Sequence, residues 1–302
     1  MDKTTQRGSL EMVAAMLISG TIGWLVLLSG QAVLDVVFWR CVFGAVTLLL
    51  ICARMGFLRR GLLNRTTFAL VVLSGVAIVA NWVLLFASYS RASIAIGTAV
   101  YNVQPFILLG LAALFLGERI TLHKLAWLVV SFVGMLAIVS AHHGQGESGS
   151  EYLLGIALAL SAALMYAVAV LIIKRLRGIP PHLIALIQVS TGALLLAPLA
   201  NVTELPAGAQ AWGALLTLGV VHTGLMYVLL YGAIQKLPTA LIGALSFIYP
   251  IAAIFVDWYA FGHRLEPLQW VGVAAILIAA AGIQLGWRVG RAAGSEWRIM
   301  AV

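Results

Sequence analysis

Long apolar runs, each separated from the next by a short polar connection, are the feature that most limits how this chain can fold. A helix needs about 20 apolar residues to cross the hydrocarbon core of a bilayer, and ten runs of that order follow one another. Their approximate limits are 10–28, 34–53, 67–88, 93–116, 125–141, 153–173, 182–200, 211–234, 239–261 and 268–287. The pattern predicts an all-α, polytopic membrane protein with ten transmembrane helices.

Charge is scarce and unevenly placed. Charged residues make up 9% of the 302 residues and hydrophobic residues 63%, whereas soluble domains are about a quarter charged. If the ten spans alternate in direction, fifteen Lys and Arg residues fall on one side, Arg91 and Arg264 on the other, and Arg40 within a span. Because positive loops stay in the cytoplasm, we expect a multi-pass protein of the plasma (inner) membrane with both termini cytoplasmic.

The second half of the chain repeats the first. A shift of 145 residues places Arg91 on Lys236, Pro105 on Pro250 and Gly117 on Gly262, and a shift of 148 places Arg40 on Gln188. Each half holds five spans, an odd number, so the two halves must have opposite orientations in the membrane. The expected architecture is therefore two inverted five-helix repeats, residues 1–143 and 144–302. Inverted repeats place a substrate site near the bilayer midplane and support alternating access.

A local motif points to a known family. The fourth span ends in the sequence from Phe115 to Thr121, FLGERIT, and the second span carries Arg40. With the ten-span, two-repeat arrangement, the chain resembles the EamA-type transporters of the drug/metabolite transporter superfamily. His263 departs from the pattern, since it stands where the first half has Glu118. The resemblance implies transport of small metabolites, either export of amino acids and related compounds or uptake of compounds such as vitamins.

The fourth span carries polar residues at its middle. Tyr101, Asn102 and Gln104 lie there beside Pro105, which cannot donate a backbone hydrogen bond and frees the carbonyl of Tyr101. A freed carbonyl must face protein or water rather than lipid. We therefore expect these four residues to bind a polar substrate. The alternative is that the two amides only join helices and that Pro105 only bends its own.

The equivalent span of the second half offers Ser246, Tyr249 and Asp257. Asp257 is the one carboxylate well inside an apolar run, and intramembrane carboxylates are functional candidates. It serves either in ion coupling or at the outer interface beside Trp258. Arg40 has three interpretations: it reaches the membrane surface, it pairs with Asp257, or it binds a substrate carboxylate.

Further candidates lie in other spans. His222 and Tyr227 share the eighth span, where an imidazole either titrates during transport or joins helices as a neutral group. Aromatic side chains that either line a substrate cavity or pack between helices are Trp24, Trp82 and Tyr166. Glu118 and Arg119 form a charged cytoplasmic corner that either anchors the helix end or acts as a gate.

Other function classes lack support in the sequence. The chain has no His-Glu-x-x-His, no Gly-x-Ser-x-Gly and no nucleotide-binding loop, so we expect neither an enzyme nor an ATP-driven pump. No cofactor, metal or nucleic acid is expected to bind. The partners should be the lipid bilayer and a small-molecule substrate, with the chain acting as a monomer or a homodimer. We interpret it as a secondary transporter, most simply an exporter of amino acids. The alternatives are an uptake carrier for an aromatic, vitamin-like or cationic compound, and a channel or a non-transporting membrane scaffold.

Overall fold

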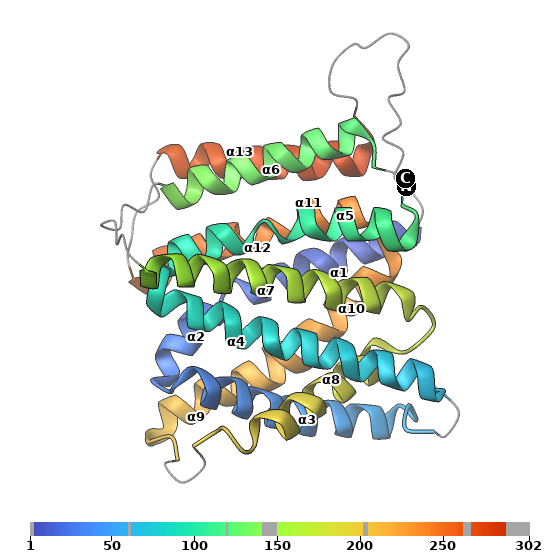
Figure 1. The fold of residues 1–302 in the computed structure, drawn as a ribbon, viewed down its shortest axis with the longest axis vertical. Helices are drawn as coiled ribbons and strands as arrows, with labels where there is room; N and C mark the ends of the chain where they lie inside the picture. Colours follow the sequence, from blue (N-terminus) through green and yellow to red (C-terminus); the bar gives the residue numbers. More distant parts are fainter. Residues whose placement is uncertain are drawn as a thin grey trace.

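The described part of the chain is all-helical (Figure 1). The computed structural model describes residues 3–59, 62–118, 120–140, 150–201, 205–261 and 267–287. Its helices are α1 (Lys3–Ser19), α2 (Ile22–Ser29), α3 (Val33–Arg54), α4 (Arg65–Tyr101), α5 (Gln104–Leu116), α6 (Leu122–Ser140), α7 (Ser150–Arg175), α8 (Pro181–Leu196), α9 (Gly208–Gly219), the π-helix η1 (Val220–Leu225), α10 (Met226–Lys236), α11 (Thr239–Ser246), α12 (Ile248–Phe261) and α13 (Pro267–Leu285).

The ten predicted spans are confirmed as ten helical segments of the bundle. Six of them are made of a single element or part of one, while the other four combine two or three helical elements. Among the described residues, five segments are long and apolar enough to cross a membrane: Lys3–Ser29, Val33–Arg54, Arg65–Tyr89, Ser150–Arg175 and Gly208–Lys236. Shorter apolar helices accompany them. We call the end of the bundle at which α1 begins the N-terminal end, and the opposite end the far end.

Helix α4 contains a chain reversal where the sequence predicted a loop. Its 37 residues would extend about 55 Å if straight, much more than the roughly 30 Å of a hydrocarbon core. A Cβ added at Gly97 would lie 2.7 Å from Ser88 Oγ, whereas residues nine apart in a straight helix are separated by about 13 Å. The chain therefore turns back inside α4 and returns through α5 (Figure 1), giving the third and fourth spans.

Two helices are broken at positions related by the repeat. The fourth span is interrupted at 102–103, between α4 and α5, and the ninth at 247, between α11 and α12. These breaks lie 145 residues apart, the shift that aligns Pro105 with Pro250, and each proline follows its break closely. Since proline removes a backbone donor, both breaks have a common cause in the sequence.

Packing also follows the inverted repeat. Helix α1 packs on α10, and its counterpart α7 packs on α4; α3 packs on α9 and η1, and its counterpart α8 packs on α4. The matched helices α5 and α11, and likewise α6 and α13, pack on each other. The largest cluster of buried side chains draws on both halves. The fold thus holds the two repeats together through a shared interior, where a common site can be built.

Small residues let the helices approach closely at this interior. A Cβ added at Gly219 would overlap Phe43 Cβ and lie 3.1 Å from the backbone N of Gly44. By contrast, a Cβ at Gly213, on the same helix α9, would meet nothing within 4 Å. Close helix contact through small residues is the usual way in which membrane helices associate.

Substitution of Gly219 by alanine is therefore expected to destabilise the bundle by about 1–3 kcal/mol, because the added methyl overpacks against α3. The matched variant Gly213→Ala should keep or slightly raise stability, since alanine is the better helix former. Thermal unfolding in detergent measures both variants. Equal melting temperatures for the two would contradict the close approach of α3 and α9.

Candidate functional site

Two irregular segments meet inside the bundle. The first span is interrupted at Gly20 and Thr21, between α1 and α2, and the eighth span widens into the π-helix η1. Within η1, Thr223 Oγ1 donates to the Leu218 carbonyl over 2.9 Å. Thr21 Oγ1 and His222 Nε2 lie 2.6 Å apart, within hydrogen-bond distance. Single turns of π-helix occur frequently at functional sites, and irregular backbone at membrane depth is tolerated where it is enclosed by protein or lines a cavity.

Arg40 lies against η1 and is almost completely buried, with 1% of its surface exposed. Its Nε donates to Thr223 Oγ1 over 2.7 Å, and one terminal nitrogen donates to the His222 carbonyl over 3.2 Å. The guanidinium carbon sits 4.2 Å from the centre of the Trp82 ring, a distance typical of a cation–π interaction. Arg40 therefore points into the bundle rather than toward the membrane surface.

The described carboxylates bind elsewhere. Glu11 pairs with Lys236, Glu118 with Lys174 and Glu151 with Arg91, while Asp35 accepts the Asn201 N–H. Among the side chains that the structure describes, Arg40 thus has no carboxylate partner. A buried charge without a counter-charge is costly. Hydrogen bonds and the rings of Trp82 and Tyr227 offset only part of that cost, which leaves the guanidinium suited to bind an anion.

Trp82 and Tyr227 occupy equivalent positions of the two repeats and touch each other. They are 145 residues apart, and Trp82 Nε1 donates to the Tyr227 hydroxyl over 2.8 Å. Around them the two halves differ: Arg40 contacts η1, while its counterpart Gln188 donates to Ser74 Oγ over 2.6 Å and accepts from the Tyr231 hydroxyl. Arg40 and its counterpart therefore differ both in charge and in their partners.

Residues of the broken fourth span extend this interior. The Tyr101 hydroxyl accepts from Asn81 Nδ2 over 3.2 Å, and the Tyr101 ring lies edge-on to Tyr166, with centroids 6.2 Å apart. Asn102 and Gln104 are buried at and just after the break. The Gln104 Oε1 atom has no hydrogen-bond partner among the described residues. Pro105 is buried, and a Cβ added at Gly243 on α11 would lie 3.0 Å from its Cβ, so the two broken helices are in contact.

The other predicted residues have different contacts or have side chains outside the described residues. Ser246 donates back to the Ile242 carbonyl of its own helix over 2.7 Å, and Tyr249 is half-buried against the main core. Trp24 is 36% exposed on α2. Asp257 lies in α12, but its side chain is outside the described residues, as is the whole of Arg119. The Arg40–Asp257 pairing accordingly stays a prediction.

Glu118 joins three helices at the N-terminal end. Its Oε1 accepts from Lys174 Nζ over 2.6 Å, and its Oε2 accepts from the backbone N–H of Thr239 at 3.3 Å, the first residue of α11. Lys174 Nζ also donates to Thr239 Oγ1 over 2.7 Å. Burial of Glu118 opposes its ionisation, but the hydrogen bonds from Lys174 and Thr239 outweigh burial and hold its pKa below the ordinary 4.5. The partners come from α7 and α11, not from the helix that Glu118 terminates.

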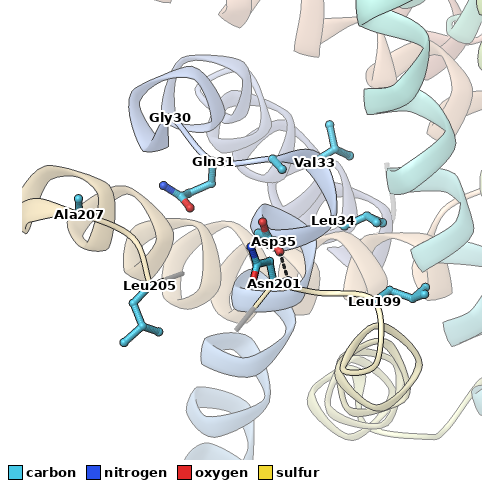
Figure 2. A pocket seen from close by; sticks show the side chains of 10 residues that line it. Gly30, Gln31, Val33, Leu34, Asp35, Leu199, Asn201, Leu205 and Ala207 are labelled. Atoms are coloured by element: carbon cyan, nitrogen blue, oxygen red, sulfur yellow. Dashed lines mark hydrogen bonds between the residues drawn. The ribbon is translucent and has the colours of Figure 1, made fainter. Parts of the chain in front are cut away.

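A pocket of about 630 Å³ opens at the far end of the bundle (Figure 2). It lies between the connection from α2 to α3 and the chain that follows α8. Figure 2 shows Asp35 beside Asn201, whose backbone N–H donates to the Asp35 carboxylate over 2.8 Å. The lining residues are Gly30, Gln31, Ala32, Val33, Leu34, Asp35, Leu199, Asn201, Leu205 and Ala207. None of the residues that the sequence singled out lines this pocket.

Sequence reasoning missed several members of the interior. Thr21, Ser74, Asn81, Gln188 and Thr223 are polar residues within apolar runs, and that placement was the available signal. Their partners lie on other helices, so nothing in their local sequence distinguishes them from residues that merely bond their own backbone. Lys174 is one of the fifteen Lys and Arg residues that the sequence places on one side of the membrane, yet its side chain is only 2% exposed.

The EamA-like transporter family matches residues 6–140 and 153–285. An uncharacterized transporter, YxxF, of Bacillus subtilis (strain 168) is 27% identical over 94% of this chain and 91% of its own length. An uncharacterized transporter of Archaeoglobus fulgidus is 26% identical over 93% of this chain and 96% of its own. Protein RarD of Streptomyces exfoliatus is 27% identical over 79% of this chain and 74% of its own.

A solved structure shares the fold. The crystal structure of another protein superimposes on this chain with a TM-score of 0.80, covering 92% of this chain and 96% of the other. The sequence identity of the pair is 19%, so this similarity concerns the fold alone.

Proposed function

The chain belongs to the EamA-like transporter family, and on that premise we propose that it exports amino acids or related small metabolites by alternating access. Transport is secondary, not driven by ATP. The proposal rests chiefly on one observation, the buried Arg40 guanidinium, which lies between the two repeats without a carboxylate partner among the described side chains. A guanidinium offers a planar pair of donors that matches a carboxylate.

Other buried groups of the bundle interior suit the rest of an amino acid. Gln104 Oε1 is a buried acceptor without a described partner, and an ammonium group is a donor that would satisfy it. Tyr101, Tyr166 and Tyr227 contribute aromatic surface for a side chain. Small-ligand sites typically combine apolar and aromatic surface with a few well-placed polar groups. Under this proposal the cargo lies between the halves, with its carboxylate on Arg40.

We place the protein in the plasma (inner) membrane, with the N-terminal end of the bundle facing the cytoplasm. The distribution of Lys and Arg supports this orientation. Glu118 and Lys174 then lie at the cytoplasmic mouth, where their hydrogen bonds to α11 hold three helices together.

The second candidate is uptake of an aromatic, vitamin-like or cationic compound. The observation that favours it is the run of aromatic contacts from Trp82 through Tyr227 to Tyr231, with ring centroids 5.4 and 5.2 Å apart. Both contacts are edge-on, and aromatic rings of this kind offer surface on which a planar cargo packs. A channel or a scaffold is the alternative from another class.

These functions are tested by measuring the flux of individual amino acids, vitamins and organic cations into proteoliposomes, with and without a pH gradient. We expect saturable flux of a carboxylate-bearing compound, competed by its relatives. Saturable flux restricted to aromatic cations would favour the second candidate. Flux that rises linearly with concentration would indicate a channel, and no flux of any compound would contradict transport.

Replacement of Gln104 by leucine tests whether Gln104 Oε1 accepts a hydrogen bond from the substrate ammonium group. A hydrogen bond to a charged donor contributes about 1.5–3 kcal/mol, so the KM for amino-acid transport should rise about tenfold or more. Thermal stability should be kept or raised, because a buried group without a partner is removed. The matched variant Gln188→Leu should instead lower stability, since it strands Ser74 and Tyr231. An unchanged KM in Gln104→Leu would exclude Gln104 from the site.

A further inference from the structure

Two ion pairs at opposite ends of the bundle have their cations at positions related by the repeat, and their carboxylates on the corresponding helices α1 and α7. Lys236 ends α10 and pairs with Glu11 on α1, with Nζ 2.6 Å from Oε1. Arg91, its counterpart 145 residues earlier, pairs with Glu151 on α7, with Nε 3.3 Å from Oε2. Each pair thus joins the third span of one half to the first span of the other.

The two pairs differ in tightness. Glu11 and Lys236 are 14% and 26% exposed, and Lys236 donates hydrogen bonds to both carboxylate oxygens. Arg91 and Glu151 are 36% and 75% exposed, and Arg91 Nε makes no hydrogen bond among the described residues. The pair at the N-terminal end is therefore formed and enclosed, while the pair at the far end is loose.

Backbone packing strengthens the contrast. A Cβ added at Gly8 would lie 3.0 Å from Lys236 Cβ, and a Cβ added at Gly232 would lie 2.9 Å from Glu11 Oε2. Glycines on both α1 and α10 thus allow these helices to close on the ion pair at the N-terminal end. Hydrogen bonds among Glu118, Lys174 and Thr239 tie the end of α5 to α7 and α11 at the same end. This structure is closed at the N-terminal end.

We propose that Glu11–Lys236 and Arg91–Glu151 are the gates at the N-terminal end and the far end of the transporter, and that the two gates close in alternation. In an inverted repeat, the two halves exchange conformations when the transporter turns over. The tight pair then takes the loose geometry and the loose pair the tight one. The proposal rests on alternating access, and it adds the residues that hold each end shut. An exposed ion pair such as Arg91–Glu151 contributes only about 0.2–1 kcal/mol, which suits a contact that must form and break in every cycle.

A covalent lock tests the gate at the N-terminal end. In a background with Cys41 and Cys52 changed to alanine, the pair Gly8→Cys and Lys236→Cys places two Cβ atoms near the roughly 3.5–4.5 Å span of a disulfide. Oxidation should abolish transport, and reduction should restore it. The matched control is Gly134→Cys with Ala275→Cys, on α6 and α13, where the Cβ separation is also 3.0 Å. That lock should leave transport largely intact.

The rate of disulfide formation gives a readout that needs no substrate. Adding Glu151→Gln to the Gly8 and Lys236 cysteine pair weakens the far-end gate in its closed form. The closed N-terminal end should then be more populated, and cross-linking should be faster by up to about fivefold, the equivalent of an exposed ion pair. The Gly134 and Ala275 control should cross-link at an unchanged rate.

The outcomes separate the two proposals. Transport that survives the lock at Gly8 and Lys236 would show a static contact and overturn the gate. A cross-linking rate that Glu151→Gln leaves unchanged would overturn the coupling between the ends. If the wild-type chain moves no compound, the proposed function fails while the rate measurement still decides the gates.

Discussion

Replacement of Arg40 by methionine is expected to reduce transport of carboxylate-bearing compounds by about 100-fold or more. Each hydrogen bond to a charged group contributes about 1.5–3 kcal/mol, and 1.4 kcal/mol is a factor of ten. The variant keeps most of the apolar length of the side chain. It loses the two N–H groups that would donate hydrogen bonds to a substrate carboxylate. Transport assays in proteoliposomes, with the amide analogue of the same compound in parallel, measure the loss.

Two comparisons make this result specific. Arg54→Met, at the exposed end of the same helix α3, should transport normally, which controls for net charge. Arg40→Lys should recover only part of the activity, because an ammonium lacks the planar fork and stacks less well on Trp82. If Arg40→Met is folded and discriminates as well as the wild type between carboxylate and amide, Arg40 does not bind the cargo.

Replacement of Glu118 by glutamine is expected to destabilise the protein by about 2–3 kcal/mol. Lys174 has a side-chain exposure of 2% and would remain charged and buried without its counter-charge, and breaking a buried pair typically costs about 3–5 kcal/mol. We expect a smaller loss than for a fully buried pair because the Glu118 side chain is 30% exposed. Thermal unfolding in detergent at neutral pH measures the change.

A second substitution separates pairing from packing. Lys174→Met should restore much of the stability lost in Glu118→Gln, because it removes the stranded ammonium. Additive losses in the double variant would show that the two residues act independently.

The same pair predicts a response to acid. Since the pKa of Glu118 lies below its ordinary 4.5 when folded, its stabilisation is present at neutral pH and is lost as pH falls through the folded pKa. The wild type should lose this contribution in acid, and Glu118→Gln should not. A variant and wild type with identical pH profiles of melting temperature would contradict the role of the carboxylate.

The sequence was sufficient for the architecture. The apolar runs are long enough to be recognised as spans in the sequence, and the distribution of Lys and Arg predicts the orientation of those spans. The matched prolines predicted irregular helices, and the breaks at 102–103 and 247 lie beside them. The proposed boundary between the halves, at 143 and 144, lies outside the described residues and stays a prediction.

The interior could be predicted only in part. The sequence predicts polar or aromatic site residues within the spans. Of these, Trp82, Tyr227 and His222 contact Arg40, and Tyr101 contacts Tyr166. No proline near Gly20 or η1 predicts the irregular backbone at either place. They arise where helices from opposite halves meet, so they depend on contacts that local sequence does not contain. For the same reason Lys174 could not be matched with Glu118, 56 residues away.

The contact between Trp82 and Tyr227 has a consequence for the ancestry of the two halves. Residues at equivalent positions that touch must lie near the axis that relates the repeats. If both were tryptophan, as in a perfect duplicate of the first half, two indole N–H donors would face each other with no acceptor. The hydrogen bond over 2.8 Å therefore requires the duplicates to have diverged at this position, and a dimer of identical first halves could not reproduce it.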